Sequence, residues 1–128
     1  MKPETAEWIG KAEGDFRTAR REWLAAEEPN FDAACFHAQQ CAEKYLKARL
    51  VEGDVPFPRI HDLEALLNLV LPLEPRWETL RAGLRQLTDM AVEVRYPGLS
   101  ADEEDAALAV DVAERVRQIV RAALGVEG

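Results

Sequence analysis

Residues 36–48 decide the fold class, and they read Phe36-His37-Ala38-Gln39-Gln40-Cys41-Ala42-Glu43-Lys44-Tyr45-Leu46-Lys47-Ala48. At about 3.6 residues per helical turn, one face of this stretch is made almost entirely of small side chains: Ala34, Ala38, Cys41, Ala42, Tyr45 and Ala48. The adjoining edge is polar and carries His37, Gln40, Lys44 and Lys47. The pattern predicts a long helix whose small face lets a second helix approach closely and whose polar edge could hold an anion.

Helical periodicity extends on both sides of this segment. The preceding helix is expected over about 5–26, where apolar residues recur at alternating spacings of three and four: Ile9, Ala12, Phe16, Ala19, Trp23 and Ala26. The second helix is expected over about 30–52, with Gly53 ending it at the C′ position. Such seams are typical of helices packed nearly antiparallel.

Two further helices follow a proline-bearing loop over 53–61. Asp62 can cap a short helix over 63–71, which Pro72 terminates. The next helix is expected to begin near Pro75, a favourable first-turn residue, and to end at Pro97-Gly98. Its apolar seam again alternates threes and fours: Trp77, Leu80, Leu84, Leu87, Ala91 and Val94.

The last helix is predicted from a capping box, Ser100-Ala101-Asp102-Glu103, to about Leu124. Four long helices with short connections favour an all-α fold, an antiparallel up-and-down four-helix bundle with an additional short helix. We expect one domain over residues 1–128, because this length suits a single hydrophobic core.

The composition limits the classes of protein to which this chain can belong. Apolar residues make up 48% and charged residues 31% of the chain, which is ordinary for a globular protein. A formal net charge of −8 argues against a broad DNA-binding surface. No apolar run approaches the roughly 20 residues of a membrane helix, and the N-terminus lacks a signal-peptide core, so a cytoplasmic protein is expected. Cys35 and Cys41 are expected to be buried and unpaired.

The spacing of chemically active residues excludes several functions. The residues three before His37 and His61 are Ala34 and Pro58, so the Glu-x-x-His pairs of di-metal bundles are absent. Zinc-helix, haem-attachment and phosphate-loop motifs are also missing. The single serine, Ser100, is explained by the expected cap. We therefore expect no metal and no cofactor.

Four segments together resemble the HEPN domain family (higher eukaryotes and prokaryotes nucleotide-binding). They are residues 12–16, residues 38–48, Ile60-His61-Asp62-Leu63 and Arg95-Tyr96-Pro97. The resemblance covers nearly the whole chain. It implies an all-α bundle that is commonly dimeric, so we expect a homodimer. It also implies a gene neighbour encoding a small nucleotidyltransferase, in a two-component or toxin–antitoxin-like pair.

The chain departs from the catalytic members of that family. Those members are metal-independent ribonucleases with an Arg-x(4–6)-His motif, whereas no histidine follows Arg95. Histidine suits proton transfer near neutral pH, and tyrosine, with a pKa of about 10, replaces it poorly. No catalytic residue is expected, unless folding or a dimer brings His61 to Arg95.

The candidate contacts for a nucleotide are Lys44, Lys47, His61, Arg95 and Tyr96, with cations for phosphate and tyrosine for base stacking. Ordinary structural roles are the alternative: a solvated lysine face, a loop imidazole and a helix end. The sequence predicts a non-catalytic HEPN protein that binds a nucleotide, an RNA or a partner nucleotidyltransferase. A ribonuclease toxin with a degenerate site and a plain dimeric interaction bundle remain alternatives.

Overall fold

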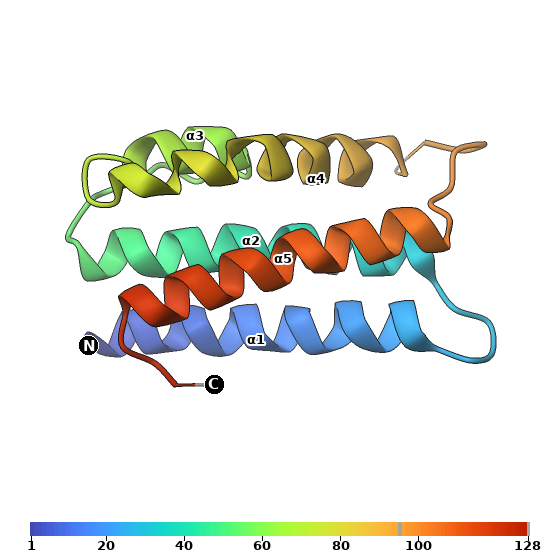
Figure 1. Cartoon of the computed structure of the whole chain (residues 1–128), viewed down its shortest axis with the longest axis horizontal. Helices are drawn as coiled ribbons and strands as arrows, with labels where there is room; N and C mark the ends of the chain where they lie inside the picture. The colour runs from blue at the N-terminus through green and yellow to red at the C-terminus, as the bar shows by residue number, and fades with distance from the viewer. Residues whose placement is uncertain (95, 128) are drawn as a thin grey trace.

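The computed structural model describes residues 1–94 and 96–127. Its helices are α1 (Pro3–Leu24), α2 (Phe31–Glu52), α3 (Leu63–Val70), the 3-10 helix η1 (Pro75–Leu80), α4 (Arg81–Glu93) and α5 (Glu103–Ala123). Within those ranges there is no strand, and the long helices run antiparallel as a bundle (Figure 1). The predicted all-α bundle with a short extra helix is confirmed.

Helix α2 is the centre of the bundle, and it packs against α1, α5, α3 and α4. Its small face is fully buried, as the sequence predicted, because the alanines let α1 and α5 lie close. Cys35 and Cys41 are buried and free. Burial raises the pKa of the Cys35 thiol to about 11, so this thiol stays protonated and unreactive near neutral pH.

The predicted cap of the last helix is wrong by two residues. Asp102 is the N-cap, and its carboxylate accepts from the Asp105 N–H at 2.8 Å while the Asp105 carboxylate accepts from the Asp102 N–H at 3.1 Å. Asp32 explains the shift, because its carboxylate accepts from the Ala101 N–H at 2.7 Å and holds that residue outside the helix. Aspartate serves as an N-cap as well as serine does, and Ser100 therefore has no capping role.

Helix α2 ends at Glu52, as expected, but Gly53 is its C-cap and not the left-handed C′ residue. Gly53 has φ −87°, and Asp54 takes the left-handed conformation with φ +58°. A Cβ on Gly53 would lie 2.5 Å from Leu73 Cδ1. Helix α1 ends at Leu24, two residues before the prediction. The fourth helix begins at Pro75 as predicted, but its first residues, Pro75–Leu80, form a 3-10 helix before α4.

None of the helices in the described part of the chain combines the length and apolarity needed to cross a membrane.

Candidate functional site

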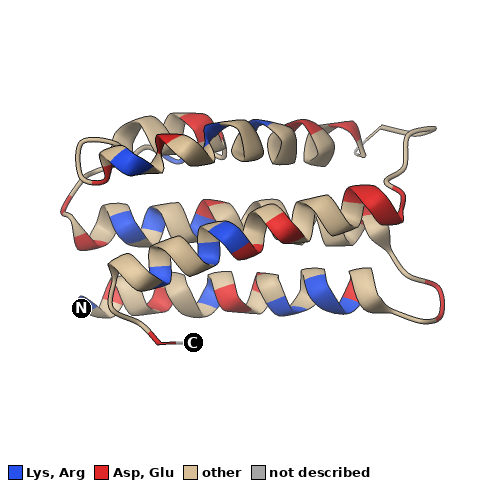
Figure 2. Ribbon diagram, in the orientation of Figure 1, with Lys and Arg blue, Asp and Glu red and all other residues tan. Residues whose placement is uncertain are grey.

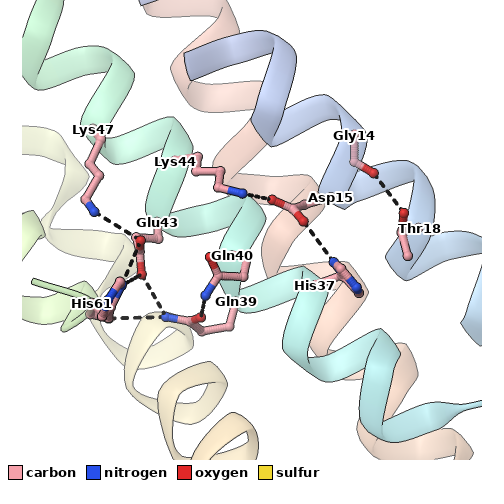
Figure 3. A network of polar contacts seen from close by, with 10 residues as sticks. All are labelled: Gly14, Asp15, Thr18, His37, Gln39, Gln40, Glu43, Lys44, Lys47 and His61. Carbon is pink, nitrogen blue, oxygen red and sulfur yellow. Dashed lines mark hydrogen bonds and ion pairs between the residues drawn. The ribbon is translucent and has the colours of Figure 1, made fainter. Parts of the chain in front are cut away.

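A polar row runs along the edge of α2 between α1 and the loop that precedes α3 (Figure 3). It consists of Asp15 from α1, His61 from the loop and six residues of α2: His37, Gln39, Gln40, Glu43, Lys44 and Lys47. Two carboxylates, Asp15 and Glu43, organise its two halves.

Glu43 organises the more buried half. It is only 2% exposed, and its carboxylate accepts from Lys47 Nζ at 3.1 Å, from His61 Nδ1 at 3.0 Å and from Gln39 Nε2 at 3.5 Å. Lys47 is itself buried, and its ammonium lies 5.4 Å from the ring centre of Trp8 and 5.7 Å from that of Phe57. A buried ammonium with these neighbours is stabilised by the carboxylate and by the two aromatic faces.

His61 is the exposed tip of this half. Its side chain is 74% exposed, although Nδ1 is held by the buried carboxylate. Because an ionised carboxylate only accepts, Nδ1 must donate, and a neutral ring then presents Nε2 as an acceptor to solvent. Gln39 Nε2 donates to the His61 carbonyl at 3.2 Å, and Asp62 caps α3 directly afterwards. The imidazole is thus fixed in position by both its ring and its backbone.

Asp15 organises the other half of the row. Its carboxylate contacts His37 Nδ1 at 2.8 Å and also accepts from Lys44 Nζ. Gln40 Nε2 donates to Gln39 Oε1 at 3.1 Å and so connects this half with the Glu43 half. The Lys44 side chain keeps 23% of its surface exposed, so part of this side chain lies at the protein surface.

The structure brings only some of the sequence-predicted residues together. Lys47 and His61 meet at Glu43, and Lys44 lies in the adjoining half of the row. Tyr96 follows α4 and is 61% exposed, and no contact within the described part of the chain joins it to the row. Arg95 lies outside the described residues.

Sequence reasoning missed the two carboxylates that neutralise these cations. The Glu43–Lys47 spacing of four was a readable signal, since such residues are neighbours on a helix. The contacts of Asp15 with α2 and of Glu43 with His61 join elements 18 to 29 residues apart, and no local pattern predicts them.

A second cluster joins α1, α2 and α5 through Glu13. Its carboxylate accepts from Arg117 Nε at 2.6 Å, from Arg121 Nη1 at 3.1 Å and from the hydroxyl of the fully buried Tyr45. Burial alone would raise the pKa of Glu13, but the hydrogen bonds from Arg117 and Tyr45 and the arginine charges lower it overall. Because one carboxylate binds side chains of three helices, this cluster ties α1, α2 and α5 together.

No grouping of three or more metal-ligating side chains lies within residues 1–94 and 96–127. The arrangement therefore offers hydrogen-bonding and proton-accepting groups, chiefly His61 Nε2 and the Lys44 ammonium, beside a helix packed on all other sides.

These features define a helical-bundle protein with a polar row anchored by two carboxylates. The HEPN domain model matches residues 5–123, and the chain belongs to this family. The chain is also similar to the crystal structure of an archaeal HEPN homologue, with 26% sequence identity and a TM-score of 0.69 over 95% of this chain and 98% of that one. The comparison with curated proteins gives no match.

Proposed function

We propose that this chain is a non-catalytic HEPN-domain protein that binds a nucleotide at the polar row and acts with a partner nucleotidyltransferase. Homodimerisation, as the family resemblance implies, is part of this proposal. A two-component or toxin–antitoxin-like system is the setting we expect for it.

The observation that carries the nucleotide proposal is the buried Glu43–Lys47 pair beneath an exposed, fixed His61. Burying an ion pair stabilises a fold little, because the desolvation of both charges offsets their attraction. A hydrophobic pair would fill the same volume at no such cost. The pair does, however, set the direction of the more exposed imidazole of the row, since the His61 side chain is 74% exposed and that of His37 is 30% exposed. A fixed and accessible side chain is what a binding site needs.

The charges indicate how a nucleotide would lie on the row. Glu43 and Asp15 neutralise Lys47 and Lys44, so the row as a whole does not attract phosphate strongly. Its amides, its imidazole and the exposed part of Lys44 suit the hydrogen-bonding edges of a base or a ribose. Lys47 would not contact the nucleotide itself, but it holds the Glu43 carboxylate that positions His61. Arg95, which lies outside the described residues, and Tyr96, which follows α4, remain proposed contacts for the phosphate and for stacking.

The direct test is equilibrium binding of ATP, GTP and a short single-stranded RNA to the purified chain. His61→Ala should weaken binding roughly tenfold, equivalent to about 1.4 kcal/mol, and Glu43→Gln should weaken it less because the amide still holds the ring. Lys11→Ala is the matched control, since it removes an exposed cation of α1 outside the row. Equal affinities of the His61 and Lys11 variants would refute the site.

The Glu43–His61 pair also favours one second candidate, a ribonuclease with a degenerate site. A carboxylate-held imidazole with a free Nε2 can accept a proton from a ribose hydroxyl. A ribonuclease also needs a cation beside the imidazole to bind the scissile phosphate. Among the described residues, no arginine contacts the His61 ring. Cleavage of labelled RNA by the pure chain, lost in His61→Ala, would establish this candidate. A chain that neither binds nor cleaves would be a plain interaction bundle.

A further inference from the structure

The negative charge of the chain is concentrated in two segments, residues 22–36 and 89–111. They contain eleven of the 24 acidic residues and one of the 16 basic residues, Arg95. Their formal charge is therefore −10, and the rest of the chain, at +2, is slightly basic. The preference of helix starts for acidic residues accounts for only part of this separation.

The fold gathers these two segments at one end of the bundle. Helices α1 and α4 finish there and helices α2 and α5 begin there, at the right of Figure 1. Figure 2 shows acidic residues on the α1–α2 loop and at the start of α5 at this end. We call residues 22–36 and 89–111 the acidic end.

The acidic end also carries most of the exposed large hydrophobic residues among those the structure describes. Seven large hydrophobic residues of the described chain are exposed, and six of them belong to this end: Leu24, Phe36, Val92, Tyr96, Leu99 and Leu108. Single exposed apolar residues are normal on a protein surface, but their gathering on one surface is typical of an interaction site.

A groove between α1 and α5 extends from this end towards the middle of both helices and has a volume of about 590 Å³. Phe16, Trp23 and Leu108 are among its apolar lining residues. Asp111 and Glu114 line it from α5, and Arg20 lines it from α1. The groove thus combines an apolar lining with acidic groups on one wall.

Local structure explains only part of the acidity. Asp32, Asp102 and Asp105 accept backbone N–H groups, as helix caps and turns require. Other carboxylates at this end are exposed and form no ion pair with any described residue: Glu27, Glu28, Glu93, Glu104 and Asp111. Glu93 is the last residue of α4, where the helix dipole disfavours a carboxylate. Its position is a cost to stability that binding could offset.

We propose that the acidic end binds a cationic amphipathic segment of a partner protein, with apolar side chains in the α1–α5 groove and lysine or arginine side chains on the carboxylates. Charge complementarity selects this occupant. A second copy of the chain would bring two ends of charge −10 together, and the repulsion disfavours it. This proposal rests on the part of the proposed function in which the chain acts with a partner protein. It does not depend on nucleotide binding at the polar row.

The probe is a synthetic helical peptide of about 14 residues with leucine on one face and lysine on the other. A peptide with glutamate in place of every lysine is its counterpart. Binding to the full chain is measured by fluorescence anisotropy, and the contact surface is mapped by amide NMR shifts. Only the lysine peptide should bind, its affinity should fall as salt is added, and the shifts should fall within 22–36, 89–111 and the groove.

Variants of the chain distinguish specific binding in the groove from general electrostatic attraction of a cationic peptide to an acidic protein. Glu104→Gln/Asp111→Asn and, separately, Leu108→Ser should each weaken binding roughly fivefold. Both changes lie on exposed positions of α5, and circular dichroism checks that the bundle is intact. Glu4→Gln/Glu7→Gln on α1 removes two equally exposed acids outside this end and should leave affinity unchanged.

Equal weakening by the control pair, or shifts spread over the whole surface, would overturn the proposal. An affinity that Leu108→Ser leaves unchanged would overturn it as well, because it would reduce the interaction to bulk charge. His61→Ala, which tests the nucleotide site, should leave peptide binding unchanged, so the two proposals can fail separately.

Discussion

Replacing Glu43 by alanine removes the carboxylate that Lys47, His61 and Gln39 all contact. His61 is exposed and can turn to water, but Lys47 is only 5% exposed and would keep a buried charge with no counter-ion. Deleting one partner of a buried ion pair costs about 3–5 kcal/mol. The aromatic rings beside Lys47 Nζ and the flexible lysine stem offset part of this, so we expect a loss of about 3 kcal/mol. That is a large share of the roughly 5–15 kcal/mol that stabilises a domain.

The double variant Glu43→Leu/Lys47→Met removes both charges and keeps the volume filled. Its free energy of unfolding should lie within about 1 kcal/mol of the wild-type value, because no buried charge is left unpaired. Urea unfolding near neutral pH, followed by far-UV circular dichroism, measures all variants, with Glu4→Ala as the exposed control. The reasoning is refuted if Glu43→Ala costs less than about 1 kcal/mol, or if the double variant is at least as unstable as Glu43→Ala.

Two further predictions concern the core and the surface. Leu66 is fully buried, so Leu66→Ala should lower the free energy of unfolding by about 2–5 kcal/mol in urea, whereas Leu108→Ala, at a position 39% exposed, should cost less than about 1 kcal/mol; similar losses would contradict the packing. Hydrogen bonds from Arg85 and Arg81 lower the pKa of Glu64 from 4.5 to about 2, so its contribution is complete above pH 4.5 and is lost as the pH falls towards 2. Acid titration of Glu64→Gln should show a shallower loss of stability over that window, and an unchanged slope would refute the contribution.

The fold was predictable because its signals are local. The small face of α2 and the three-four seams of the other long helices depend only on residues within a few turns of one another, and every expected helix is present. The error at the last helix has a cause that is distant in sequence. The start of α5 moved by two residues because Asp32, from a distant segment, holds Ala101 outside the helix. Gly53 was expected as the C′ residue, whereas the structure gives the left-handed conformation to Asp54.

The candidate site was predictable only in its parts. Lys44, Lys47 and His61 were expected as free cations for a phosphate, and the structure places two carboxylates among them. A helical wheel could show that Glu43 lies one turn before Lys47, but it could not show that an imidazole 18 residues later completes the cluster. Whether a polar residue is buried depends on what packs over it, and for Lys47 the covering rings of Trp8 and Phe57 come from α1 and from a loop.

The sequence by itself determined the helices, their apolar faces, the bundle class and the family, because each of these follows from periodicity and short motifs. Tertiary structure alone decided which charges meet. It paired Asp15 and Glu43 with the cations of α2 and His61, and it joined two acidic segments more than 50 residues apart into one end. The physical reason is the range of the interactions: helix formation depends on neighbours within a turn, whereas burial and charge pairing depend on distances in space that only the packed bundle sets.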